Sequence, residues 1–270
     1  ACSAGRCERR IDMTDLDIAH AAMDADPEND AKRLQFYERL ADTELFMLLG
    51  AEAEGDKVEP ELFEIEDQNF VLIFDREERL AQFVGREAPY AGLSGRVLCN
   101  MVAGQGIGFA LNLEVAPSAM LIPAEAVEWL NATLDNKPDE TEARLSEVSA
   151  PKGLPEAVVT GLDRKLAIAA GLANIAYLAA AKYDDNSRGH VLVFIDAVPG
   201  AQDALARAAG EALTFSGIEA GTMDVMFARG SDPLAAHLAK VGLRFDLPAL
   251  HDPQAPSAPG MDPNRPPKLK

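Results

Sequence analysis

The stretch Gly106–Leu130, GIGFALNLEVAPSAMLIPAEAVEWL, predicts how the first half of the chain folds. Apolar residues occupy every second position from Ile107 to Val115, a period typical of a strand with one buried face. Ala-Pro-Ser at 116–118 ends this run. A second short apolar run follows at 119–122, and Pro123 stands where the first residue of a helix is expected. The stretch therefore predicts strand, loop, strand and helix.

The composition indicates a globular protein with an acidic surface. The chain has 270 residues, of which 48% are hydrophobic and 26% charged, enough for two domains with their own cores. Forty-four acidic residues against 25 Lys and Arg give a formal charge of −19. Such a surface repels phosphate backbones and anionic lipids, so we expect no nucleic-acid partner and no membrane partner. It is compatible with plain solvation or with a partner protein that carries basic patches.

The three cysteines show no spacing typical of a metal site. They are Cys2, Cys7 and Cys99, an odd number, and Cys99 lies in an apolar helical window that predicts a buried, inert thiol. We see no secretory signal, and the longest apolar run, at 166–181, is too short to span a bilayer. These features predict a cytoplasmic protein without a metal or cofactor.

The predicted fold class is α/β (α+β), with two mixed α/β domains joined by a polar linker. In the second domain we expect the element order αββαβαβ, with helices on one face of the sheet. The proline-rich end of the chain is expected to be disordered. The predicted divisions are an upstream extension at 1–12, a first domain at 13–134, a linker at 135–153, a second domain at 154–248 and a tail at 249–270.

Local signals place the helices and turns of the first half. Thr14 is expected to cap a helix over 15–23, and Ser94 a helix over 95–102. Asp26-Pro27 predicts the start of a helix that runs to Ala41. Asp75 is expected to cap a helix over 76–84. Asp67-Gln68 lies between two apolar runs and predicts a hairpin turn.

Several segments of the first half resemble the amino-terminal domain of the SseB family, the bacterial proteins named for enhanced serine sensitivity. They are FDREERLAQF (74–83), YAGLSGRVL (90–98), GQGIGFALN (104–112) and PAEAVEWL (123–130). The family pattern continues from this asparagine as Asn-Pro-Gly, whereas here Asn112 is followed by Leu113 and Glu114. This difference affects the turn after the strand, not the expected fold.

The second half is similar to the carboxy-terminal domain of the same family. The similar segments are LPEAVVTGLDRKLA (154–167), EALTFSGIEAGTMDV (211–225) and GLRFDLP (242–248). The resemblance implies a protein of two α/β domains. It carries over no catalytic residue.

None of the motifs that suggest chemistry has the required context. Gly104, Gly106 and Gly108 follow a helix and precede a strand, the reverse of a dinucleotide-binding loop, and predict a helix stop and a close backbone approach. Asp184, Asn186 and Arg188 occupy positions of a calcium loop, but the arginine replaces a carboxylate, and a hairpin turn is expected instead.

The remaining candidate side chains are scattered. The four histidines have no partner at the spacing of a zinc site, and they are His20, His190, His237 and His251. Arg96 could lower the pKa of Cys99 if both faced a pocket. Four acidic residues lie near strand ends and could be imagined as an acid/base pair: Glu64, Glu66, Asp67 and Asp75. In so acidic a chain such close spacing is expected by chance, so it does not indicate catalysis.

These patterns lead to two functional hypotheses. The first is a non-catalytic protein-interaction or regulatory binding module linked to serine sensitivity. Its partner surface is expected where the last strand meets the proline-rich tail, at Phe245, Asp246, Leu247 and Pro248. The alternative is a small-molecule sensor or enzyme with its site between the two domains.

Overall fold

The computed structural model describes residues 13–52, 58–135, 145–217 and 223–249. The chain divides into two compact units, one comprising Ala1–Pro138 with Gly210–Ala220 and the other Asp139–Ala209 with Gly221–Lys270. Both units combine helices with a mixed sheet, so the predicted α/β class is confirmed. The predicted extension at 1–12 and nearly all of the predicted tail lie outside the described residues.

The first unit contains five helices and six strands among its described residues before 136. In chain order they are α1 (Asp15–Asp24), α2 (Asp30–Asp42), β1 (Glu44–Leu48), β2 (Leu62–Ile65), β3 (Gln68–Phe74), α3 (Glu77–Val84), β4 (Tyr90–Ser94), α4 (Gly95–Val102), β5 (Ile107–Leu111), β6 (Met120–Ile122) and α5 (Ala124–Leu134). The order strand, loop, strand, helix predicted for 106–130 is therefore confirmed.

The first sheet has the strand order β4-β1-β3-β5-β6, and β2 also pairs with β3. β3 and β5 are parallel, and the other pairs are antiparallel. The parallel pair requires a long crossover, which here contains α3, β4 and α4. Within this crossover the chain forms β4, which pairs with β1 at the edge of the sheet. The sequence did not indicate this edge position.

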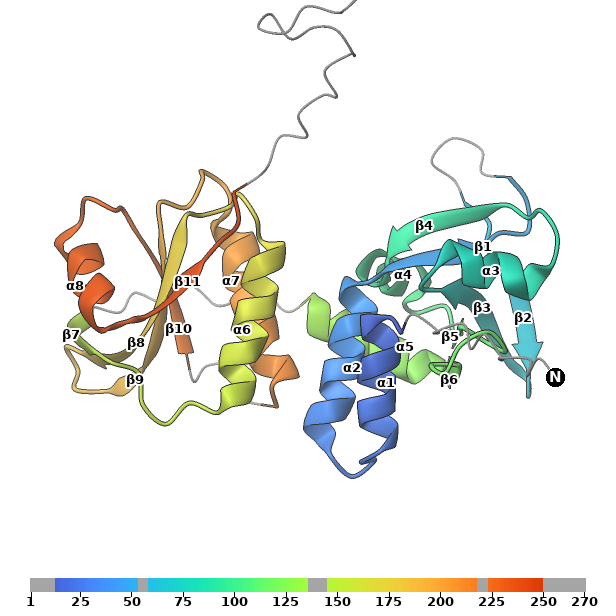
Figure 1. Cartoon of the computed structure of the whole chain (residues 1–270), viewed down its shortest axis with the longest axis horizontal. Helices are drawn as coiled ribbons and strands as arrows, with labels where there is room; N and C mark the ends of the chain where they lie inside the picture. The colour runs from blue at the N-terminus through green and yellow to red at the C-terminus, as the bar shows by residue number, and fades with distance from the viewer. Residues whose placement is uncertain (1–12, 53–57, 136–144, 218–222, 250–270) are drawn as a thin grey trace, which may run out of the picture. The chain divides into compact units, whose positions relative to one another are not determined.

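Helices cover the two faces of this sheet unequally. One face packs against α1, α2, α4 and α5, in a core that includes Phe36 and Leu98. The other face packs against the eight-residue α3, through Leu80 and the strand residue Phe74 (Figure 1). The sequence predicts one buried and one less apolar face for β5. All five of its residues are buried, because β5 lies inside the sheet with side chains packed on both faces.

The caps of α1 and α4 are the ones predicted. The Thr14 side chain accepts a hydrogen bond from the backbone N–H of Asp17, and Ser94 accepts one from Val97. The predicted start of α2 is wrong. That helix begins at Asp30 with Asn29 as its cap, because the Asp26 side chain accepts bonds from Asn29 and Lys32 instead.

The second unit contains three helices and five strands among its described residues. They are β7 (Leu145–Ser149), α6 (Glu156–Ile168), β8 (Ile175–Tyr183), β9 (Arg188–Ile195), α7 (Gln202–Phe215, of which 210–215 cluster with the first unit), β10 (Met223–Ala228), α8 (Pro233–Val241) and β11 (Leu243–Asp246). The predicted elements are all present. β7 is an additional strand, which falls inside the stretch interpreted as a linker.

The second sheet has the order β10-β9-β8-β11, with β7 pairing to β8 beyond the end of β11. Side chains of α8, among them Leu238, pack on the face that carries Tyr177 and Val193. Figure 1 shows α6 and α7 on the opposite side of the sheet from α8. The expectation of helices on one face is therefore wrong. Both faces of β8 and β9 are apolar, and each needs a cover.

Candidate functional site

A buried polar cluster lies where β3 and β5 end. Because these strands are parallel, Asp75 after β3 and Asn112 after β5 lie at the same edge of the sheet. In open α/β sheets this edge is the usual position of a ligand site. We call this group the Arg79 cluster, and its members are Thr14, Asp17, Asp75, Arg79, Asn112 and Ser118.

The Arg79 guanidinium connects two carboxylates of the cluster. Its Nη1 donates to Asp75 Oδ1 at 2.7 Å and Oδ2 at 3.0 Å, and to Asp17 Oδ1 at 3.1 Å. Its Nη2 donates to Asp17 Oδ2 at 2.5 Å. Asp75 lies one helical turn before Arg79, whereas Asp17 comes from α1. The predicted cap role of Asp75 is wrong, because its carboxylate binds Arg79 and Arg76 is the N-cap of α3.

Two hydroxyl groups complete the hydrogen bonding of these carboxylates. Thr14 Oγ1 donates to Asp75 Oδ2 at 2.5 Å, and Ser118 Oγ donates to Asp17 Oδ1 at 2.6 Å. Ser118 in turn accepts a bond from the Asn112 side chain at 2.9 Å. The side-chain oxygen Oδ1 of Asn112 accepts a hydrogen bond from the backbone N–H of Asp75 at 3.1 Å, which joins the two strand ends.

Charge and burial explain the protonation of the cluster. Burial raises the pKa of the Asp17 carboxyl, but bonds from Arg79, Ser118 and the Thr14 backbone, with the charge of Arg79, outweigh it and lower that pKa to about 2. Burial lowers the pKa of the Arg79 guanidinium. Its hydrogen bonds to Asp17 and the negative charges of Asp17 and Asp75 outweigh this effect, so that the pKa lies above its ordinary value. Asp17 and Arg79 are therefore both charged at neutral pH.

The Arg79 cluster is a structural device. Asp17, Asn112 and Ser118 are fully buried, and the acceptors of the two carboxylates are engaged by donors of the protein itself. A general acid or base needs access to a substrate proton, which this packing denies. The cluster fixes α1 and the loop after β5 to the edge of the sheet.

The loop after β5 has an unusual backbone. Asn112 has a φ of 49° and Glu114 a φ of 60°, both in the left-handed region that favours glycine or asparagine. Glu114 occupies the position where the family pattern has glycine, and it is exposed. The turn therefore keeps its shape despite the change of sequence, because the buried bonds of Asn112 hold its first residue.

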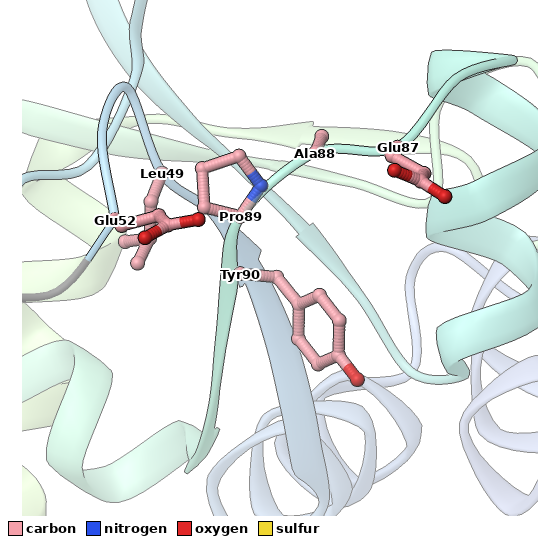
Figure 2. A pocket seen from close by; sticks show the side chains of 6 residues that line it. All are labelled: Leu49, Glu52, Glu87, Ala88, Pro89 and Tyr90. Atoms are coloured by element: carbon pink, nitrogen blue, oxygen red, sulfur yellow. The ribbon is translucent and has the colours of Figure 1, made fainter.

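A second candidate lies on the surface at the edge strand β4. An open hollow of about 450 Å³ is lined by residues that follow β1, precede β4 or begin it: Leu49, Glu52, Glu87, Ala88, Pro89 and Tyr90. Figure 2 shows the carboxylates of Glu52 and Glu87 on opposite sides of Pro89, with the Tyr90 ring below it. The hollow thus combines apolar surface with two exposed acidic side chains.

Tyr90 belongs to an aromatic pair on the sheet face that carries α3. Its ring packs edge-on against Phe46, with 5.8 Å between the ring centroids. The pKa of the Tyr90 hydroxyl is raised, first by its hydrogen bond to the Glu77 carboxylate. The Tyr90 side chain remains 40% exposed, so one side of this pair is available to a ligand.

The predicted partner surface at 245–248 is largely turned inward. Phe245 and Leu247 are buried, whereas Asp246 and Pro248 are exposed. The Pro248 carbonyl accepts the N–H of Gly171 at 2.8 Å, and the Asp246 carboxylate binds Arg244. The alternation of β11 explains this, since every second residue faces the core. A partner could contact only the two exposed residues and the outer edge of the strand.

The glycines and Cys99 have the structural roles predicted for them. Gly104 and Gly106 have positive φ values in the turn after α4. A Cβ on Gly108 would lie 2.5 Å from the Ile122 carbonyl oxygen, so the close backbone approach is confirmed. Cys99 is fully buried, and burial outweighs the opposing charge of Arg96 and raises the thiol pKa to about 12.

The three histidines of the described residues do not converge, and His251 lies outside those residues. His20 packs against Phe36, His190 bonds to the Lys152 carbonyl, and His237 bonds to the Val148 carbonyl. In the described part of the chain, no three His, Cys, Asp or Glu side chains form a group that could hold a metal ion. The predicted turn between β8 and β9 is formed by residues 184–187, with Asn186 at a φ of 66°.

Sequence reasoning missed both the Arg79 cluster and the edge strand. The only local signal for the cluster was the spacing of Asp75 and Arg79 on one helical turn, which also occurs in ordinary surface pairs. The signal for β4 was the short run from Tyr90 to the helix cap Ser94. Because this run has only five residues and contains a glycine, its sequence did not clearly predict a strand.

The comparisons with known proteins identify a family domain in the first unit. Residues 16–129 match the family model described as the SseB protein N-terminal domain. No curated protein and no solved structure matches the chain. The match spans β1 to β6, five of the six members of the Arg79 cluster, and the hollow. The similarity of 154–248 to the carboxy-terminal domain stays a prediction. Within the described ranges, no helix has the length and apolar character needed to cross a membrane.

Proposed function

We propose, on the basis of the match of residues 16–129 to the SseB protein N-terminal domain, that the chain is a non-catalytic protein-interaction module of the SseB family. We propose that its main partner surface is the β4 surface, defined as the outer edge of β4 with the adjoining hollow and the Phe46–Tyr90 pair. The same proposal includes the cytoplasm as its location and a link to serine sensitivity.

The observation that carries the proposal is the exposed edge of β4. Its position at the end of the strand order leaves its outer side without a pairing strand among the described residues. Proteins commonly protect such edges with charge, proline or a covering loop, because an open edge can pair with another chain. Here the edge lies next to an exposed aromatic residue and an open hollow, which favours use as a binding surface.

The Arg79 cluster supports the same proposal, because it fills the usual position of a small-molecule site. It occupies the sheet edge where a ligand site would be expected, and it fills that edge with buried side chains bonded to one another. The position typical of small-molecule binding is thus used for stability. The surface around β4, by contrast, is open to a partner.

Site-specific crosslinking in living cells tests the proposal. A photoreactive benzoylphenylalanine at position 90 should form adducts with another polypeptide after illumination. The matched control is position 129, since Trp129 is 41% exposed and also packs edge-on against a second aromatic ring. Adducts at 90 and not at 129 are expected. Equal adducts at both positions, or none at 90, would refute the β4 surface as the binding site.

The predicted surface at 245–248 forms a second part of the proposal. Leu243 is 40% exposed on the same edge strand as Asp246 and gives a third crosslinking position. Adducts at 243 would assign a role to the β11 edge, whereas their absence would confine the interaction to the first unit.

A further inference from the structure

The backbone of β4 directs hydrogen-bonding groups away from β1 at alternate residues. Leu49 N donates to Pro89 O, and Gly95 N donates to Thr43 O, each at 2.9 to 3.0 Å. With the register Phe46↔Gly92, these contacts make the odd-numbered residues of β4 the ones bonded to β1. The N–H and C=O groups of Tyr90 and Gly92 therefore point outward, away from the sheet.

Gly92 exposes part of the aromatic pair beside this edge. A Cβ on Gly92 would meet the Phe46 ring at 3.6 Å and Glu44 Oε1 at 3.5 Å, both ordinary contacts. The glycine thus leaves the Phe46 ring uncovered at a place that could hold a methyl group. Together with the exposed Tyr90 ring, it provides aromatic surface next to the outward-pointing backbone.

Carboxylates surround this aromatic surface. Glu52 and Glu87 line the hollow. The Glu77 carboxylate accepts a hydrogen bond from the Tyr90 hydroxyl, and Glu44 lies beside Gly92. One basic residue, Arg86, stands in the loop that leads to β4. Aromatic rings flanked by carboxylates attract Lys and Arg side chains, through the ring quadrupole and through charge.

We propose, resting on the function proposed above, that the occupant of the β4 surface is an extended basic segment of another protein. It adds to the sheet as a strand next to β4, with backbone bonds to Tyr90 and Gly92. A Lys or Arg side chain lies over the Phe46–Tyr90 pair, near Glu52 and Glu87. An acidic segment would place like charges together, and so would a second copy of this chain, which would bring the same glutamates to the joint.

A peptide titration on the full chain tests this assignment. The probe is an acetylated and amidated peptide of seven residues in which valine alternates with lysine. Its partner has glutamate in place of each lysine, so the two peptides match in length and strand propensity. Amide chemical shifts of the isotope-labelled protein report the site. We expect the basic peptide to shift Tyr90 and Gly92, and to bind about tenfold more tightly than the acidic peptide.

Two pairs of variants locate the binding further. Gly92→Pro removes an outward N–H without removing a bond to β1, so it should abolish the shifts, and Gly92→Ala is its folded control. Glu87→Lys should weaken the basic peptide, whereas Glu128→Lys, the same change on exposed α5 surface, should leave it unchanged. The fluorescence of Trp129 verifies that each variant is folded.

Distinct results separate this inference from the proposed function. Equal binding of both peptides, or shifts centred on β11, would overturn the basic segment as occupant. Sedimentation showing a dimer that Gly92→Pro dissociates would overturn it as well, in favour of a second copy. If crosslinks form at position 90 in cells while the basic peptide fails to bind, the interaction surface stands and the basic occupant is wrong.

Discussion

Replacement of Arg79 by methionine should strongly destabilise the first unit. Methionine keeps much of the length of the side chain but donates none of the four hydrogen bonds that now reach Asp17 and Asp75. Two buried carboxylates would then face each other without a counter-charge. Removal of one partner from a buried ion pair typically costs about 3–5 kcal/mol. This is a large part of the roughly 5–15 kcal/mol that stabilises a domain.

Urea denaturation followed by tryptophan fluorescence measures this loss. The chain has a single tryptophan, Trp129 on α5 in the first unit, so its emission reports the unfolding of that unit. With a urea dependence of about 2 kcal/mol per molar, the midpoint should fall by about 2 M. Arg33→Met is the matched control, since Arg33 forms an exposed pair with Asp30 that is worth about 0.5 kcal/mol or less. A loss below about 1 kcal/mol for Arg79→Met would refute the structural role of the cluster.

The pH dependence of stability provides a second measure of the same cluster. The Asp17 pKa is about 2 in the folded state against an ordinary value of 3.8. A lowered pKa means that the folded state holds the charged form more strongly, so this stabilisation is present above about pH 4 and is lost as the pH falls toward 2. The difference corresponds to about 2 kcal/mol. Relative to wild type, Asp17→Asn should therefore lose less stability between pH 5 and pH 2. Parallel profiles for the two proteins would contradict the shift.

Three further outcomes follow from the geometry. Gly95→Ala should destabilise the first unit by about 3 kcal/mol in the same urea assay, because the added Cβ would lie 1.8 Å from the Leu40 carbonyl oxygen. A variant as stable as wild type would show that α4 can move away from Leu40 at little cost. Glu114→Gly should change stability by less than about 1 kcal/mol, since glycine relieves the left-handed backbone strain but increases the entropy of the unfolded chain. Asn112→Ala should instead cost at least about 2 kcal/mol, because it removes two buried hydrogen bonds. Cys99 should resist iodoacetamide at pH 8 until urea is added, as peptide mass spectrometry can show, since burial keeps its thiol protonated with a pKa of about 12.

The sequence by itself determined the local elements of this protein. Thr14 and Ser94 marked two helix starts, because a helix cap depends on residues within one turn of it. The apolar run at 107–111 and the turn at Asn186 were also readable, since strand periodicity and turn geometry are local properties. The family resemblance of the first unit likewise came from short segments, and the match at 16–129 confirms it.

The tertiary structure alone decided which of these elements meet. Arg79 finds Asp17, 62 positions away, only because α1 returns to the end of β3. β4 becomes an edge strand because the crossover from β3 to β5 carries it outward, and no pattern within Tyr90–Ser94 expresses that. Phe245 and Leu247 looked like an exposed apolar end, but they are buried because β11 pairs with β8 and turns them to the core. Periodicity shows that a strand has a face to bury, whereas strand order and packing decide which face, edge and charge remain for a partner.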